Sequence, residues 1–201
     1  MRVCNPLFLT LSIAMALAAN KKVDFRVTPE ELARHPQRVI SEDVAIAVTP
    51  FIESERTKPL FGGKANPYDH GVLPVLLMIR NEGKQTISLK NMTVEFFGST
   101  RQKLEPVPPN DVPYLHGPSP GKIESSPIPG MPGRMKIKKN VFQSQDFIER
   151  GFAAKMLPPG EFAWGFFYFQ TGLGRGSKIL VHGISQASTG KELFFFEAPL
   201  D

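Results

Sequence analysis

The stretch PVLLMIRNEGKQTISLKNMTVEF, residues 74–96, decides the fold of this 201-residue chain. The apolar run from residue 72 to residue 80 ends at the turn sequence NEGK and predicts a strand buried on both faces. Residues 86–96 then alternate apolar and polar side chains, with a phase slip between Leu89 and Met92 that indicates a bulge or a bend. We expect the two strands to form a hairpin through the short turn.

Further strands are predicted on either side of this pair. Residues 44–52 are rich in β-branched side chains, and residues 162–169, FAWGFFYF, are mostly aromatic. The aromatic side chains fall on both faces of that strand, which predicts a central strand of the core. Residues 178–184 and 192–197 follow glycine-containing turns and predict two more strands. Because no helices alternate with the strands, the pattern predicts a mostly β fold, an antiparallel immunoglobulin-like β-sandwich.

Two short helices and one long loop interrupt the strands. Thr28 precedes Pro29, and Glu31 follows three residues after Thr28, which is a capping-box pattern that predicts a short helix. Residues 144–156 predict a second helix. Residues 105–133 contain proline every few positions and no apolar period, so we expect a long Pro-rich loop without an internal strand or helix. Loops of this length are either functional or disordered.

The N-terminal residues have the pattern of an export signal. Arg2 precedes an apolar run, residues 7–17, and small side chains occupy positions Ala16 and Ala18. This layout predicts a secretory signal peptide over residues 1–18. The apolar run is shorter than the roughly 20 residues that span a bilayer, so a cleaved signal is favoured over a retained anchor or a buried first strand.

The predicted cleavage defines the mature chain and its location. We expect residues 19–42 to form a lead-in with the short helix, and residues 43–201 to form one β-sandwich domain, in the periplasm or outside the cell. The only cysteine, Cys4, lies within the signal. The mature chain would therefore contain no disulfide, no cysteine metal site and no thiol nucleophile. A lipid anchor at a first mature cysteine is excluded for the same reason.

The chain is mildly basic, with a formal net charge of +5. A charge of this size gives a mild attraction to anionic surfaces and does not by itself predict nucleic-acid binding. We therefore expect no nucleic-acid partner.

Two stretches carry a resemblance to a known group of proteins. PVLLMIRNEGKQTISLKNMTVEF and LPPGEFAWGFFYF, residues 157–169, together resemble uncharacterised bacterial exported proteins with an immunoglobulin-like β-sandwich. In that group a hydrophobic strand that ends in Asn-x-Gly is followed, later in the chain, by a Leu-Pro-Pro-Gly turn and an aromatic strand. The resemblance covers residues 43–96 and 157–197, implies the fold and an envelope location, and brings no catalytic residues with it. The Pro-rich loop departs from a minimal sandwich.

The histidines show no metal-binding spacing. They are far apart and none belongs to an HExxH motif, so we predict no metal site and no cofactor. Asp69 and His70 are adjacent, and we interpret Asp69 as a turn residue that bonds its own backbone rather than as half of a catalytic pair. The four histidines are His35, His70, His116 and His182.

The sequence contains two weaker catalytic patterns. The sequence GISQA, residues 183–187, nearly matches a nucleophile elbow, but its serine ends a predicted strand instead of starting a helix. Acidic residues in loops could come together only in the fold, which leaves an exported hydrolase open as an alternative. These acids are Glu53, Glu55, Asp69 and Asp111.

The candidate binding residues lie in and beside the Pro-rich loop. In the stretch RMKIKK, residues 134–139, a strand would place every second residue, all basic, on one face. This basic stripe is Arg134, Lys136 and Lys138. Its structural alternative is an edge strand that lysines protect from pairing with other chains. The loop itself offers four apolar anchors, Tyr114, Leu115, Ile128 and Met131.

The sequence thus favours a binding function over a catalytic one. Our leading hypothesis is a non-enzymatic binding or assembly module of the bacterial envelope, with an envelope protein or an anionic polymer as its partner. The alternatives are the exported hydrolase and a structural accessory domain without a ligand. The oligomeric state stays open.

Overall fold

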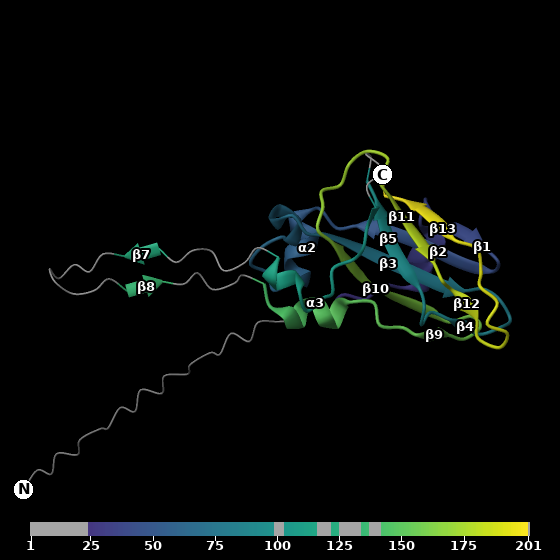
Figure 1. The fold of residues 1–201 in the computed structure, drawn as a ribbon. Helices are drawn as coiled ribbons and strands as arrows, with labels where there is room; N and C mark the ends of the chain where they lie inside the picture. Colours follow the sequence, from purple (N-terminus) through teal and green to yellow (C-terminus); the bar gives the residue numbers. More distant parts are fainter. Residues whose placement is uncertain (1–23, 99–102, 116–121, 125–133, 137–141, 201) are drawn as a thin grey trace, which may run out of the picture.

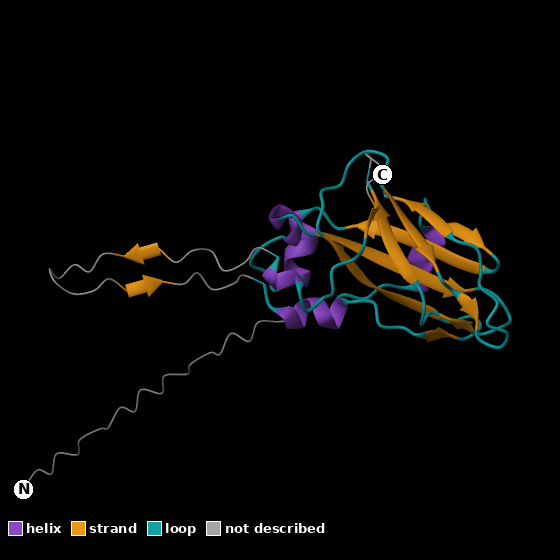
Figure 2. Ribbon diagram, in the orientation of Figure 1, coloured by secondary structure: helices purple, strands orange, loops and turns teal. Residues whose placement is uncertain are grey.

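The computed structural model describes residues 24–98, 103–115, 122–124, 134–136 and 142–200. These residues form mostly antiparallel β-sheets with a few short helices, which confirms the predicted β-sandwich class (Figure 1 and Figure 2). The predicted signal peptide lies outside the described residues.

Two four-stranded sheets make up the sandwich. The first sheet has the strand order β1-β2-β3-β10 and the second has the order β13-β11-β5-β6, and every neighbouring pair is antiparallel. The first sheet consists of β1 (Val39–Ser41), β2 (Val44–Pro50), β3 (Leu73–Asn81) and β10 (Phe162–Phe169). The second sheet consists of β5 (Thr93–Phe97), β6 (Lys103–Leu104), β11 (Lys178–His182) and β13 (Phe196–Pro199).

Two smaller sheets complete the β structure. A three-stranded sheet has the order β12-β4-β9, and a separate two-stranded sheet pairs β7 with β8. The three-stranded sheet consists of β4 (Ile87–Ser88), β9 (Met156–Leu157) and β12 (Ser185–Gln186). The two-stranded sheet consists of β7 (Lys122–Glu124) and β8 (Arg134–Lys136).

The first sheet is buried on both faces, as the apolar run of residues 72–80 predicts. Every second side chain of β3, including Leu77, enters the core between the two sheets, which we call the inter-sheet core. The side chains between them, including Leu76 and Met78, enter a second cluster on the opposite face, which we call the outer core. The outer core also holds Phe61 and explains why a nine-residue strand contains almost no polar residue.

Short helices cover the outer core. Leu32 of α1 and Phe147 of α3 both reach this cluster and are almost fully buried. Figure 2 shows several of the helices at the end of the sandwich away from β4, β9 and β12, whereas α1 lies against β2 and β3. The α-helices are α1 (Pro29–Arg34), α2 (Ser54–Thr57) and α3 (Ser144–Arg150), and the 3-10 helices are η1 (Lys58–Leu60), η2 (Pro67–His70) and η3 (Val112–Tyr114).

The predicted hairpin through the NEGK turn is wrong. Strand β3 pairs with β2 and β10, whereas β4 pairs with β9 and β12 and β5 pairs with β11 and β6. The turn therefore carries the chain from the first sheet toward the second instead of folding it back on itself. The phase slip between Leu89 and Met92 is confirmed as a break, because it separates β4 from β5.

The position of the aromatic strand also differs from the prediction. Both faces of β10 are covered, since Phe169 enters the inter-sheet core while Phe166 and Tyr168 enter the outer core. Yet β10 is the last strand in the order of its sheet rather than a central one. Within the described part of the chain, isolated bridges from Val107 to Tyr168 and from Gly151 to Phe166 continue the pairing beyond it.

The helix at Thr28 is confirmed and the one at residue 144 is shorter than predicted. At the start of α1, the Glu31 carboxylate accepts a hydrogen bond of 3.2 Å from the backbone N–H of Thr28. Helix α3 ends at Arg150, because the backbone is already extended at Gly151 and Phe152 N–H bonds to Phe166 of β10.

The described part of the Pro-rich segment contains a 3-10 helix and a strand. The prediction that residues 105–133 hold no helix or strand is wrong, because η3 and β7 lie within it. Pro113 sits in the first turn of η3, where a helix leaves its N–H groups unpaired, so the missing donor costs little. Strand β7 falls in a stretch free of proline, residues 121–126.

Candidate functional site

The residues predicted to bind a partner divide into three groups. Tyr114 lies at the end of η3 and is 72% exposed, whereas Leu115 is partly buried and packs against the outer core. Arg134 and Lys136 belong to β8, the first half of the predicted basic strand. The remaining three, Ile128, Met131 and Lys138, lie outside the described residues.

Strands β7 and β8 form a two-stranded antiparallel ribbon, which we call the ribbon. Its register places Lys122 opposite Lys136, Ile123 opposite Met135, and Glu124 opposite Arg134. Neither strand makes an extensive contact with any other described helix or strand. In Figure 1 the pair lies well clear of the two large sheets. The ribbon is therefore a two-stranded sheet separate from the other described sheets.

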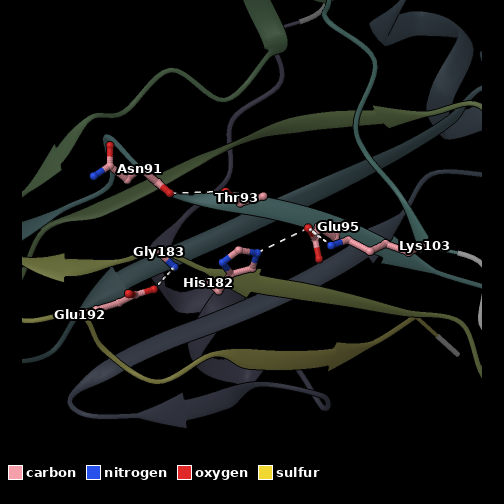
Figure 3. Close-up of polar contacts among 7 residues, drawn as sticks. All are labelled: Asn91, Thr93, Glu95, Lys103, His182, Gly183 and Glu192. Atoms are coloured by element: carbon pink, nitrogen blue, oxygen red, sulfur yellow. Dashed lines mark hydrogen bonds and ion pairs between the residues drawn. The ribbon is translucent and has the colours of Figure 1, made fainter.

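A polar cluster that the sequence did not predict lies on the outer face of the second sheet. It consists of Glu95 on β5, Lys103 on β6 and His182 on β11 (Figure 3). One carboxylate oxygen of Glu95, Oε1, lies 2.7 Å from Lys103 Nζ and 3.5 Å from His182 Nε2. The cluster thus joins three neighbouring strands through a single acid.

Strand alternation explains the position of Glu95. Val94 and Phe96 point into the inter-sheet core, so Glu95 points to the opposite face of β5. Its side chain is nevertheless only 6% exposed. The hydrogen bond from Lys103 lowers the pKa of the Glu95 carboxyl, burial opposes that shift, and His182 adds to the lowering. Glu95 is therefore held in its ionised form, as suits a structural ion pair rather than a general acid.

The turn beside His182 has a backbone that only glycine fits. Gly183 has a φ of +76°, and an added Cβ would lie 2.2 Å from the carbonyl oxygen of Asn91. The Gly183 N–H donates to Glu192 Oε1 over 3.1 Å, and the Thr93 hydroxyl donates to the Asn91 carbonyl over 3.5 Å (Figure 3). These contacts fix the turn after β11. Ser185 follows in β12 and not at a helix start, so the nucleophile-elbow geometry is absent here.

The Asp69 carboxylate accepts hydrogen bonds from neighbouring side chains and not from its own backbone as predicted. Its Oδ1 accepts a hydrogen bond of 3.4 Å from Asn66 Nδ2, and its Oδ2 accepts one of 3.4 Å from Ser54 Oγ. Asn66, rather than Asp69, caps the η2 turn by accepting a bond from the Tyr68 backbone N–H. The interpretation of Asp69 as a residue that bonds its own backbone is thus wrong, but its contacts remain those of a loop anchor.

The histidines that the structure describes occupy separate environments. His35 Nε2 lies 3.1 Å from Thr49 Oγ1, the His70 ring meets Phe142 edge-on, and His182 faces Glu95. Among the described residues, no group of three or more histidine, cysteine or acidic side chains could hold a metal ion. His116 lies outside the described residues.

A small hollow lies beside α2. Its volume is about 210 Å³, and it is lined by Pro50, Phe51, Ile52, Glu53 and Arg56. The Arg56 guanidinium lies over the Phe51 ring, 4.9 Å from its centroid. Glu53 is the single carboxylate of this hollow, so it lacks the pair of acids that glycoside hydrolysis uses.

Fold and sites together define a β-sandwich of mostly antiparallel strands with an outlying ribbon and an ion-paired outer face. Solved structures that match this chain include a protein of unknown function from Listeria monocytogenes EGD-e, with 12% identity, a TM-score of 0.36, and coverage of 81% of this chain and 80% of that one. The archaellum periplasmic stator protein FlaG from Sulfolobus acidocaldarius has 18% identity, a TM-score of 0.29, and coverage of 61% of this chain and 85% of that one. The FlaF and FlaG stator complex from the same organism has 19% identity, a TM-score of 0.29, and coverage of 61% and 76%.

Likenesses at this level say nothing about activity or partners. No protein-family model matches the chain, and no curated protein matches it either. Within the described residues, no helix is both long enough and apolar enough to cross a membrane.

Proposed function

We propose that this chain is an exported, non-enzymatic binding or assembly module of the bacterial envelope, and that it meets its partner through the Pro-rich segment and the ribbon. The observation that supports this most is the ribbon itself, which stands apart from both cores (Figure 1). The two strands of the ribbon pair with each other although they lie apart from the large sheets. Such a segment suggests a role outside folding.

The surroundings of the ribbon fit the same role. Tyr114, in the segment that leads to β7, exposes 72% of its surface although it belongs to an ordered 3-10 turn. Neighbouring prolines limit its freedom, so less conformational entropy is lost when a partner docks. The basic residues of β8 would add electrostatic steering that weakens as salt rises.

The described acids lend less support to the hydrolase alternative. Glu95 is ion-paired, Asp69 anchors a loop, and the hollow beside α2 contains Glu53 alone. A structural accessory domain without a ligand stays as the second alternative, and it predicts that the ribbon can be removed without loss of contacts in the cell.

The test compares the full chain with a variant in which residues 116–141 are replaced by a Gly-Ser linker. Both are expressed in a bacterial host and treated with an amine-reactive crosslinker, and the envelope fraction is analysed for adducts. We expect specific adducts with the full chain and their loss in the variant, whose thermal unfolding should stay unchanged because neither ribbon strand makes an extensive contact with another described helix or strand. The same adducts from both proteins would favour the accessory-domain alternative.

A further inference from the structure

Two exposed apolar side chains lie on neighbouring helical elements at one end of the sandwich (Figure 2). Tyr114 at the end of η3 is 72% exposed, and Ile148 of α3 is 44% exposed. The two elements contact each other, and their buried residues Val112 and Phe147 both belong to the outer core. The two exposed side chains therefore belong to one stretch of the surface, which we call the apolar patch.

The backbone beneath the apolar patch is held in place by Tyr168 of β10. The Tyr168 carbonyl accepts a hydrogen bond of 2.7 Å from the Val107 N–H, and the Tyr168 hydroxyl donates to the Phe147 carbonyl over 3.0 Å. The Tyr114 N–H donates to the Asp111 carbonyl over 2.9 Å and closes the turn of η3. Because both elements are fixed before any partner arrives, docking on the patch would cost little conformational entropy.

The charged side chains around the apolar patch are acidic. Asp111 precedes Tyr114 by three residues, Glu149 directly follows Ile148, and both acids are exposed. The segments 105–115 and 142–150 together contain four acidic residues and one basic residue, a formal charge of −3 on a chain of +5. That basic residue is turned inward, since it is only 8% exposed and donates from its Nε to a backbone carbonyl of η1 over 2.7 Å. The surface of the patch is therefore opposite in sign to the chain as a whole.

We infer that the apolar patch is a docking surface for a polypeptide segment of the partner in which an apolar residue is flanked by lysine or arginine. The apolar residue would pack on Tyr114 and Ile148, and the basic residues would approach Asp111 and Glu149. The same acids would repel an anionic polymer or an anionic lipid surface. This inference rests on the proposed function, because it names the chemistry of the partner that meets the start of the Pro-rich segment.

The first test measures the fluorescence anisotropy of a labelled octapeptide of alternating lysine and leucine with the full chain after signal removal. We expect saturable binding that weakens as salt rises. An octapeptide of alternating lysine and serine should bind at least about tenfold more weakly, because it has no apolar side chain to place on the patch. Equal binding of the two peptides, or no saturable binding below about 1 mM, would overturn the inference.

Charge reversal supplies the matched variants for the same measurement. The double variant D111K/E149K should bind the lysine-leucine peptide at least about tenfold more weakly than the wild type. The control E82K/E161K reverses two exposed acids in the turns next to β4 and β9 and should leave the affinity within about twofold. Both variants should unfold at the temperature of the wild type, because all four side chains are exposed. Equal weakening by the two variants would show a general attraction of charges and would contradict a specific patch.

Photocrosslinking in cells separates this inference from the proposed function. A photoreactive phenylalanine analogue is placed at Ile148 or at Ile40, which are exposed to similar extents, 44% and 49%. We expect position 148 to capture the same protein as position 114, at a peptide with lysine or arginine beside the crosslinked residue, and position 40 to capture none. An adduct from position 114 without one from position 148 would overturn the docking surface and leave the proposed function standing. No adduct from either position would contradict both.

Discussion

The side-chain amide of Asn81 donates a hydrogen bond of 2.9 Å to the carbonyl oxygen of Leu157, 76 residues further along the chain. The same amide donates to the Gln85 carbonyl over 2.7 Å, and the backbone of Asn81 exchanges bonds with Gly160 and Glu161. The Asn-x-Gly end of β3 and the Leu-Pro-Pro-Gly turn are therefore one physical unit. In this chain the two motifs that carry the resemblance therefore contact each other.

Replacing Asn81 should destabilise the fold strongly. Asn81 is only 1% exposed, and in N81D the Leu157 carbonyl would lose its donor in a buried contact and the Gln85 carbonyl in a partly buried one. An unsatisfied buried group costs about 1–3 kcal/mol, so we expect a loss of at least about 1 kcal/mol in the free energy of unfolding. Urea titration followed by circular dichroism measures it. A change below about 0.5 kcal/mol would show that the hydrogen bonds of the Asn81 side chain are not needed for stability.

Removing the Tyr168 hydroxyl should cost less, and in a defined way. Tyr168 is fully buried and donates a hydrogen bond of 3.0 Å to the Phe147 carbonyl, which ties β10 to α3. Y168F leaves that carbonyl unsatisfied, for an expected loss of about 1–2 kcal/mol in urea titration. The matched control is Y114F, whose ring is mostly exposed and whose change should stay within about 0.5 kcal/mol. Equal effects of the two variants would contradict the assignment.

Glu95 should make stability depend on acid pH. Its pKa is lowered in the folded state, chiefly by Lys103, so the unfolded chain binds the proton more readily. The contribution is complete above the ordinary carboxyl value of 4.5 and is lost as pH falls through the lowered value. Wild type should therefore lose more stability than E95Q as pH falls from 6 to 3, about the range over which carboxyls titrate. E197Q, which affects the exposed pair with Lys178, serves as the control and should follow the wild type.

The mature N-terminus should be Ala19. Ala16 and Ala18 supply the small side chains that signal cleavage needs. The intact mass of the protein recovered from the envelope or medium measures the cleavage. A mass that includes Met1 or Cys4 would contradict the predicted signal.

The sequence predicted burial far better than pairing. The apolar run of β3 indicates a strand covered on both faces, and both cores contain its side chains. The same pattern cannot say which strand lies beside it, because apolar side chains are alike toward any neighbour. The NEGK turn therefore predicts a hairpin, although it carries the chain from the first sheet toward the second.

The polar cluster shows the same limit for a site. Glu95 alternates with Val94 and Phe96 like any outward-facing residue, and nothing in its local sequence marks it as buried. Only the pairing of β5 with β6 and β11 brings Lys103 and His182 to it. Tyr114, by contrast, lies among prolines in the sequence and is exposed in the structure, and its role as a binding anchor stays a prediction.

Site-specific photocrosslinking tests directly whether the chain meets its partner through the Pro-rich segment. Tyr114 and Phe194 are exposed to similar extents, 72% and 68%, but only Tyr114 belongs to the Pro-rich segment. A photoreactive phenylalanine analogue is placed at one position or the other in the full chain, and cells are irradiated before the envelope is analysed. If the Pro-rich segment meets the partner, we expect a discrete adduct from position 114 and none from position 194. Adducts of equal yield from both positions, or from position 194 alone, would contradict it.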